Sequence, residues 1–180
     1  SIYFDNDGSQ TYFRIGDTLA QYPTMEVDSI TFGANSNTIY ITYNGSWVSV
    51  INPLAFEGVS IAVVGANVIV NSVSETQDIN YSLSGTTADG MFKIYSAKRY
   101  NLLLNGVHIT NPDGPAINVQ SEKKTSVELV NGTSNTLTDG TTYAAATING
   151  NGDPEDQKAT FFSEAHLVFS GSGSLIITGN

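Results

Sequence analysis

NLLLNGVHITNPDGPAINVQS, residues 101–121, is apolar enough for a protein core, but turn-forming pairs interrupt it three times. The pairs are Asn105-Gly106, Asn111-Pro112 and Asp113-Gly114. Asn, Asp, Gly and Pro each favour tight turns, for different steric and hydrogen-bonding reasons. Between the turns, apolar residues recur at alternate positions, as they do on a strand with one buried face. The stretch therefore predicts short β-strands that are joined by sharp corners.

An internal repeat relates this stretch to the sequence on either side of it. FKIYSAKRYNLLLNG aligns with INVQSEKKTSVELVNG at an offset of 25 residues, so that Phe92 matches Ile117 and Ser96 matches Ser121. ATFFSEAHLVFSGSG begins a third copy after an insertion at about residues 138–158. Repeats of this length, built from short strands, are typical of solenoids. In a parallel β-helix each strand pairs with its counterpart in the next repeat, about 4.8 Å away.

An antiparallel β-sandwich is the alternative architecture. In a sandwich, Asn44-Gly45, Asn105-Gly106 and Asn131-Gly132 would be ordinary hairpin turns, which Asn-Gly pairs favour. A sandwich gives no reason for similar residues to recur at a fixed offset, whereas the stacking of like residues on like does. We therefore expect an all-β fold, a parallel β-helix, with the sandwich as the alternative.

The first 35 residues have a different pattern. TYFRIGDTLAQYP alternates on both sides of Gly16-Asp17, as a hairpin does, and MEVDSITF reads as a turn followed by a strand. The sequence thus predicts a short N-terminal hairpin or cap segment at residues 1–35 and a β-helix over residues 36–180.

Composition narrows the classes of function. The chain has 180 residues, no cysteine and a net charge of −10. The negative charge disfavours nucleic acid and anionic membrane surfaces as partners. The absence of cysteine from the sequence excludes disulfides, thiolate zinc sites and cysteine nucleophiles. The longest apolar stretch, residues 59–73, is too short and too interrupted to span a bilayer.

Four segments resemble a known family. They are YSLSGTTADGMFKIYS, NLLLNGVHITNPDGPAINVQSEKK, NGTSNTLTDG and KATFFSEAHLVFSGSGSLIITGN. Over about residues 37–180 the chain resembles the carbohydrate-binding-domain family of secreted bacterial β-helix proteins, which are similar in fold to pectate-type polysaccharide lyases. Relatives continue beyond the position of LIITGN, so we expect further rungs of the β-helix after Asn180.

The resemblance implies a right-handed parallel β-helix, export from the cell and calcium bound among the rungs. It also implies binding of cellulose-like or polygalacturonate-like polysaccharides without established cleavage. The segment YFRIGDTLAQYPTMEVDSITF resembles those that precede surface or periplasmic domains in gut bacteria. A secreted, cell-surface or periplasmic location is therefore expected.

One corner of the predicted repeats is rich in positive charge. The alignment places Lys98 and Arg99 directly beneath Lys123 and Lys124, which are four of the seven cationic residues. Such a corner would suit the carboxylates of a linear uronic-acid polymer. The alternative is a solvated corner whose lysines keep a strand edge soluble.

Aromatic side chains are further candidates for contact with sugar. Exposed aromatic faces usually cover the apolar side of a pyranose ring. Trp47, Tyr43, Tyr95 and Tyr100 are candidates by position. Tyr95 alternates out of phase with the inward Ile94, and Tyr100 follows the basic corner, so both are expected beside the cations. The alternative is an ordinary surface role, and Trp47 would then cap the first rungs.

The insertion contains NGNGDPEDQK, which offers oxygen ligands at nearly alternate positions. The candidate calcium ligands are Asn149, Asn151, Asp153, Glu155 and Asp156. Calcium favours such hard oxygen groups. The spacing is not that of an EF-hand, because Pro154 takes the place of the turn glycine. A flexible acidic loop is the alternative.

Catalytic motifs are sparse in the sequence. His108 and His166 lack the spacing of metal ligands, and no serine lies in a nucleophile elbow. A lyase would use Arg99 as its base, together with calcium. We therefore expect a secreted, calcium-stabilised, non-catalytic binder of a linear polysaccharide. The alternatives are a polysaccharide lyase that acts on uronic-acid polymers and a structural or adhesive surface protein.

Overall fold

The structure of the chain is a computed structural model, which describes residues 2–4, 10–15, 18–23 and 37–180. The chain divides into two compact units, Ser1–Asn35 and Ser36–Asn180. All regular elements of the described residues are β-strands. Within these ranges, no helix is long and apolar enough to cross a membrane. The chain is therefore all-β, as the sequence predicts.

The first unit contains a three-stranded antiparallel sheet in the order β1-β2-β3. Its strands are β1 (Ile2–Phe4), β2 (Gln10–Ile15) and β3 (Thr18–Pro23). β2 and β3 pair with Ile15 opposite Thr18, on either side of the expected Gly16-Asp17 turn. That turn and the strand expected in MEVDSITF lie outside the described residues.

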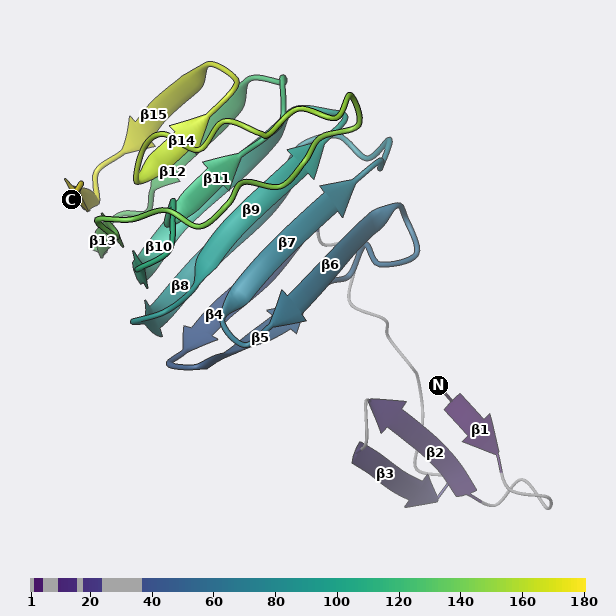
Figure 1. The fold of residues 1–180 in the computed structure, drawn as a ribbon. Coiled ribbons are helices and arrows are strands. Elements are labelled where there is room, and N and C mark those ends of the chain that lie inside the picture. The colour runs from purple at the N-terminus through teal and green to yellow at the C-terminus, as the bar shows by residue number, and fades with distance from the viewer. Residues whose placement is uncertain (1, 5–9, 16–17, 24–36) are drawn as a thin grey trace. The chain divides into compact units, whose positions relative to one another are not determined.

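The second unit contains two sheets, and the chain passes repeatedly from one to the other (Figure 1). The long sheet has the order β15-β12-β10-β8-β4-β5; β13 also pairs with β10, and β16 pairs with β13. Its strands are β4 (Thr38–Asn44), β5 (Trp47–Ile51), β8 (Ile79–Thr87), β10 (Tyr100–Asn111), β12 (Thr125–Leu129), β13 (Ser134–Asp139), β15 (Leu167–Gly171) and β16 (Ser174–Thr178).

The short sheet has the order β14-β11-β9-β7-β6. Its strands are β6 (Val59–Val64), β7 (Asn67–Ser72), β9 (Met91–Ser96), β11 (Ile117–Val119) and β14 (Phe161–Ser163). Both sheets of the second unit are mixed. β4 pairs antiparallel with β5 and β6 pairs antiparallel with β7, whereas the other ladders are parallel.

The parallel ladders join strands that are one repeat apart. β9 pairs with β11 so that Phe92 is the partner of Ile117, and Ile117 is in turn the partner of Phe161 on β14. At the corner beyond β11, the Ser121 hydroxyl donates a hydrogen bond of 2.8 Å to the carbonyl of Ser96. Both contacts join positions that the sequence alignment equates. The predicted pairing of Phe92 with Ile117 and the proximity of Ser96 to Ser121 are therefore confirmed.

The three Asn-Gly pairs have three different roles. Asn44-Gly45 lies at the β4–β5 hairpin, where Asn44 ends β4 and Gly45 begins the turn; the sandwich alternative gives all three pairs a place in a hairpin. Asn105-Gly106 lies inside β10, so the strand end expected there is wrong. The side-chain oxygen of Asn135 accepts hydrogen bonds from the N–H groups of Gly106 (2.9 Å) and Val107 (3.0 Å), which keeps the strand paired through a bulge. Asn131-Gly132 forms a corner between β12 and β13.

The apolar core lies between the two sheets of the second unit and draws on both. Every second residue of the central strands points inward, as on β4, where Ile39, Ile41 and Tyr43 are buried. The residues between them point outward. The rest of the core includes Val68, Val70, Tyr81, Leu83, Phe92, Ile94, Leu102, Leu104, Ile109, Ile117, Val119, Val127 and Leu137. Packing thus decides which side chains of each strand are available to a ligand.

Asp139, the last residue of β13, holds the chain at both ends of the long insertion. Its Oδ2 atom accepts hydrogen bonds from the hydroxyls of Tyr143 (2.5 Å) and Thr160 (2.9 Å), and its Oδ1 atom accepts one from the N–H of Asn180 (2.8 Å). Burial by itself would raise the pKa of Asp139, but these hydrogen bonds stabilise the carboxylate and lower the pKa below its ordinary value. The ionised form of Asp139 therefore stabilises the folded state.

We expect the free energy of unfolding to fall as the pH falls through the lowered pKa of Asp139. A carboxyl group whose folded-state pKa is depressed contributes stability that is complete above its unfolded pKa, about 4, and is lost in acid. Asp139→Asn should therefore lower the free energy of unfolding by about 1 kcal/mol at neutral pH and by less in strong acid. Urea unfolding of wild type and of Asp139→Asn, at neutral pH and in strong acid, measures the difference in unfolding free energy. A difference of equal size at the two pH values would contradict a stabilising role for the Asp139 carboxylate.

Candidate functional site

The insertion between β13 and β14, residues 140–160, packs against the outer face of the short sheet (Figure 1). We call it the strap. The N–H of Ala144 donates a hydrogen bond of 2.8 Å to the carbonyl of Asp113, in the turn after β10. The side chain of Gln120, just after β11, donates one of 2.7 Å to the carbonyl of Asp156. The strap is therefore attached to two successive segments of the underlying repeat.

A buried ion pair joins the strap to the centre of the sheet. Lys93 lies on β9 between the inward-facing Phe92 and Ile94, so its side chain points outward under the strap. Its Nζ atom forms a salt bridge with Glu155, and the two side chains are only 5% and 8% exposed. The same Nζ atom donates to the Thr147 hydroxyl at 3.0 Å. Breaking such a pair would leave an uncompensated buried charge, which is costly.

Tyr95 completes this anchor. It lies two residues beyond Lys93 on β9, on the same outer face of the sheet. Its hydroxyl donates a hydrogen bond of 2.8 Å to Oε1 of Glu155. The Lys93 Nζ atom lies 5.3 Å from the centroid of the Tyr95 ring, within the range of a cation–π contact. Glu155 is therefore held from two sides by β9.

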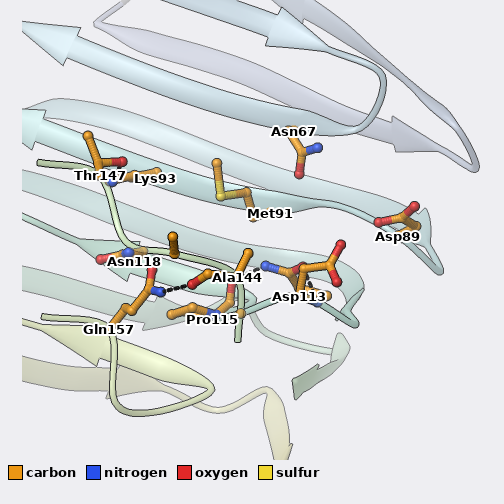
Figure 2. A pocket seen from close by; sticks show the side chains of 13 residues that line it. Asn67, Asp89, Met91, Lys93, Asp113, Pro115, Asn118, Ala144, Thr147 and Gln157 are labelled. Atoms are coloured by element: carbon orange, nitrogen blue, oxygen red, sulfur yellow. Dashed lines mark hydrogen bonds between the residues drawn. The ribbon is translucent and has the colours of Figure 1, made fainter. Parts of the chain in front are cut away.

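A pocket of about 220 Å³ lies between the strap and the outer face of the short sheet (Figure 2). We call it the strap pocket. Asn67, Met91 and Asn118 line it from three neighbouring strands, β7, β9 and β11. Asp113 lines it from the turn after β10, and Gln157 lines it from the strap. The sheet thus supplies the floor of the strap pocket and the strap supplies its roof.

Polar side chains of the strap pocket retain capacity for a ligand. Asn118 is only 2% exposed, and its Oδ1 atom accepts a hydrogen bond of 2.7 Å from Gln120. Its Nδ2 atom has no hydrogen-bond acceptor among the residues that the structure describes. Gln157 donates through Nε2 to the carbonyl of Ala144 at 2.8 Å, which leaves its Oε1 atom as an acceptor. The pocket therefore offers donors and acceptors together.

The turn that carries Asp113 is held rigidly by Asn111. The Asn111 side chain donates a hydrogen bond of 2.8 Å to the carbonyl of Pro115 and accepts one of 3.1 Å from the N–H of Asp113. Both ends of this buried amide are thus satisfied within the turn. The Asp113 side chain itself is exposed and faces the strap pocket, to which Asp89 also contributes (Figure 2). The pocket therefore has a negative side.

An open groove adjoins the strap at the carboxyl ends of β9 and β11. It consists of two hollows, of about 420 and 580 Å³, which share Tyr95, Gln120 and Glu122. Lys123 lines the smaller hollow, and Glu155 lines the larger one. The structure thus brings the predicted ligand residues Tyr95 and Lys123 to one groove. The groove also contains Glu122, which the sequence-based prediction did not include, and Glu155, which it assigned to calcium.

The predicted basic corner is present but is not purely basic. β10 begins at Tyr100 opposite Thr125 of β12, so Lys98-Arg99 and Lys123-Lys124 occupy the same corner of successive repeats. Lys98 forms a salt bridge of 2.7 Å with Glu75. Arg99, Lys123 and Lys124 are exposed. Neighbouring carboxylates therefore offset part of the positive charge.

Two of the aromatic candidates are buried and do not present a face to a ligand. Tyr100 is only 2% exposed, because it points inward in phase with Leu102, and its ring lies 5.5 Å edge-on from that of Tyr81. The prediction that Tyr100 is an exposed sugar contact is therefore wrong. Tyr43 is also 2% exposed, and its hydroxyl donates to the carbonyl of Met91 at 2.9 Å. Trp47 is 57% exposed on β5 and keeps its candidate role.

Three of the five predicted calcium ligands make other side-chain contacts in the structure. Glu155 is paired with Lys93, and the Oδ1 atom of Asn149 accepts hydrogen bonds from the N–H groups of Asn151 (2.9 Å) and Asp153 (3.1 Å). Asp156 forms a salt bridge of 2.6 Å with Lys158. Among the residues that the structure describes, no three His, Cys, Asp or Glu side chains gather in a metal-binding group. Calcium binding by these residues therefore stays a prediction.

Asn118, Gln157 and Lys93 were not singled out from the sequence. One signal was available for Lys93, because it is the only charged residue in the strand MFKIYS. A lone charge in the middle of a strand whose neighbours form the core requires a partner from elsewhere. That partner, Glu155, lies 62 residues away in the sequence, and no local pattern identifies it.

The comparisons with known proteins agree with a role in carbohydrate binding. A family described as carbohydrate-binding domain-containing protein matches residues 65–180. A protein of the same description from Acetivibrio thermocellus is 33% identical over 122 residues, which cover 66% of this chain and 41% of the relative. This chain therefore spans less than half of the relative's length.

Among solved structures, a gadolinium derivative of the polysaccharide lyase-like protein from C. thermocellum is similar. The TM-score is 0.58 at 24% identity, and the match covers 77% of this chain and 51% of the other. At this identity the likeness shows a shared fold. From the match over residues 65–180, the chain belongs to the carbohydrate-binding domain family.

Proposed function

We propose that this chain is a non-catalytic polysaccharide-binding module built on a right-handed parallel β-helix and located outside the cytoplasm. Its membership of the carbohydrate-binding domain family supports the binding role. Parallel ladders between successive repeats, and the fold shared with a polysaccharide lyase-like protein, support the β-helix. The location rests on the sequence resemblance to secreted proteins.

The strap pocket is the observation that carries the proposal. Sugar hydroxyls both donate and accept hydrogen bonds, so they match the Asn118 donor, the Gln157 acceptor and the Asp113 carboxylate. Asn118 is only 2% exposed, so its side chain is held in place beneath the pocket and little of it contacts water. The volume of about 220 Å³ is below the range of roughly 300–1,000 Å³ that is common for small-molecule sites. We therefore assign the pocket to a single sugar unit of a longer chain.

Charge favours a neutral sugar in the strap pocket. The carboxylates of Asp113 and Asp89 would repel the carboxylate of a uronic acid. A cellulose-like polysaccharide has no such charge. An acidic polymer such as polygalacturonate would instead contact the basic corner, where Arg99, Lys123 and Lys124 are exposed. Neutral polymers are thus the leading ligand class, and acidic polymers are the second.

We expect Asn118→Ala to weaken the binding of short, neutral β-linked oligosaccharides about tenfold. One such hydrogen bond is worth about 1–1.5 kcal/mol, which corresponds to roughly one power of ten in Kd. Titration calorimetry with soluble cello- and xylo-oligosaccharides measures the change. Asn131→Ala, at an exposed corner outside the strap pocket, is the matched control. Equal Kd values for all three proteins would remove the strap pocket from the proposal.

The strap must stay closed for the proposed site to exist, because it supplies Gln157 and the roof. Glu155→Gln would leave Lys93 buried without its counter-charge, and the expected loss of unfolding free energy is about 3–5 kcal/mol. Oligosaccharide affinity should fall as well. Urea unfolding and the rate of proteolysis within residues 140–160 report the two effects.

Asp156→Asn is the control for the strap prediction. It removes a neighbouring carboxylate of the same strap, but the salt bridge of Asp156 with Lys158 is solvent-exposed, with 51% and 78% of the two side chains accessible. Exposed ion pairs contribute little to stability. Equal stabilities for the Glu155 and Asp156 variants would contradict the anchoring role of Lys93.

Replacement of Lys98, Arg99, Lys123 and Lys124 with alanine should reduce retention by an acidic polymer and leave retention by a neutral one unchanged. Affinity electrophoresis in polygalacturonate, xylan and hydroxyethylcellulose measures this, with and without a chelator. Unchanged mobility of the variant in polygalacturonate would remove the basic corner as a site.

The same experiment tests calcium and catalysis. Loss of wild-type retention in the presence of the chelator would support calcium binding. Unsaturated product absorbing in the ultraviolet would favour the lyase alternative.

A further inference from the structure

The outer face of the long sheet carries exposed aromatic and aliphatic side chains at the β4–β5 hairpin. Tyr40 is the cross-strand partner of Ile51, and Asn44 is the partner of Trp47. Partners in an antiparallel pair project to the same side of the sheet. Because Ile39 and its alternate neighbours are buried, these partners point outward. Tyr40, Trp47 and Ile51 are 47%, 57% and 63% exposed.

The same face is uncharged over four neighbouring strands. β5, β4, β8 and β10 follow one another in the sheet, and their sequences contain no Asp, Glu, Lys or Arg. The chain as a whole has 17 acidic and 7 basic residues. Soluble proteins usually place charge on exposed sheets and edges to prevent association. An exposed sheet without charge is therefore a candidate for an interaction surface.

The polar groups of this face are hydroxyls and amides. Between the rows of Tyr40 and Trp47, the hydroxyls of Thr42 and Ser84 lie 3.1 Å apart. Between β8 and β10, the Asn101 side chain donates a hydrogen bond of 2.8 Å to that of Asn80. Hydroxyl groups in such pairs keep unused donor or acceptor capacity. The face thus alternates aromatic surface with uncharged hydrogen-bonding groups.

We propose that the outer face of β5, β4 and β8, with Tyr40 and Trp47 as its aromatic contacts, is a second binding surface for a neutral polysaccharide chain. The proposal rests on the polysaccharide-binding function proposed above and adds a site on the other sheet. Aromatic rings cover the apolar faces of pyranose units, and hydroxyls and amides bond to their edges. The lack of charge suits a neutral polysaccharide, and the face has no Lys or Arg that could pair with the carboxylates of an acidic one.

The spacing of the two aromatic residues indicates the length of ligand required. Trp47 lies opposite Asn44, which is four residues from Tyr40 on β4. At about 3.4 Å per residue, the two side chains are separated by roughly 14 Å along the strand. A single sugar unit cannot contact both rings. This face therefore differs from the strap pocket, because it recognises a chain rather than one unit.

The test compares a double variant, Tyr40→Ala with Trp47→Ala, with wild type and with Phe56→Ala. Phe56 is fully exposed in the connection after β5 and controls for the loss of any exposed aromatic side chain. The double variant should bind insoluble cellulose or hydroxyethylcellulose at least tenfold more weakly. Its affinity for short oligosaccharides and its unfolding midpoint should not change. Polymer affinity equal to that of wild type would overturn the proposal.

The single tryptophan of the chain gives a direct readout. Trp47 fluorescence should shift to shorter wavelength when wild-type protein binds the soluble polymer, and the shift should persist in Asn118→Ala. A shift on concentrating the protein without polymer would assign the face to a second copy of the chain and overturn the proposal. If wild type binds neither polymers nor oligosaccharides, the proposed function fails, whereas polymer binding without a tryptophan shift rejects this second surface alone.

Discussion

The in-register parallel pairing of strands that are one sequence repeat apart is the constraint on which most of the second unit depends. Because strands lie about 4.8 Å apart, a backbone position in one repeat fixes the position above it. Phe92, Ile117 and Phe161 form one inward column of this kind. Close approach also restricts side chains, since a Cβ atom at Gly85 would lie 2.1 Å from the carbonyl oxygen of Tyr43. Gly85 has a φ of 82°, which further favours glycine.

Stacking also determines what the outer faces can offer. Inward columns are apolar, and the outward side chains of the same strands form rows of equivalent surface positions. On the short sheet one row includes Ile69, Lys93 and Asn118, which are register partners on β7, β9 and β11. Lys93 is the charged residue among these three, and its buried ammonium group requires the counter-charge of Glu155. The strap therefore binds the sheet at Lys93, the position where a charged residue takes the place of an uncharged one.

The repeat predicted the stacking, but it did not predict every turn or the site. The offset between Phe92 and Ile117 predicted their pairing, because residues stacked in neighbouring strands share one environment and therefore resemble each other. Asn44-Gly45 is ambiguous, since the same pair suits a hairpin and a corner, and the first repeat has no earlier strand against which to stack. Tyr100 was misjudged because β10 begins one residue after the basic corner, which puts the ring in phase with the core. The contacts of Asn118 and Glu155 depend on where the strap lies, and no periodicity encodes that.

Under the proposed function, the two outer faces present different chemistry to the same class of ligand. The strap pocket is narrow and roofed, with a buried amide that can select one sugar unit but cannot hold a chain over a distance. The face of Tyr40 and Trp47 is open and uncharged, and its contacts need a chain that is longer than one unit. Weak binding at either face would suffice if the ligand is a polymer, because the first contact raises the effective concentration of the second. A module with two such faces would thus discriminate against free monosaccharides through its geometry, without high affinity at any single site.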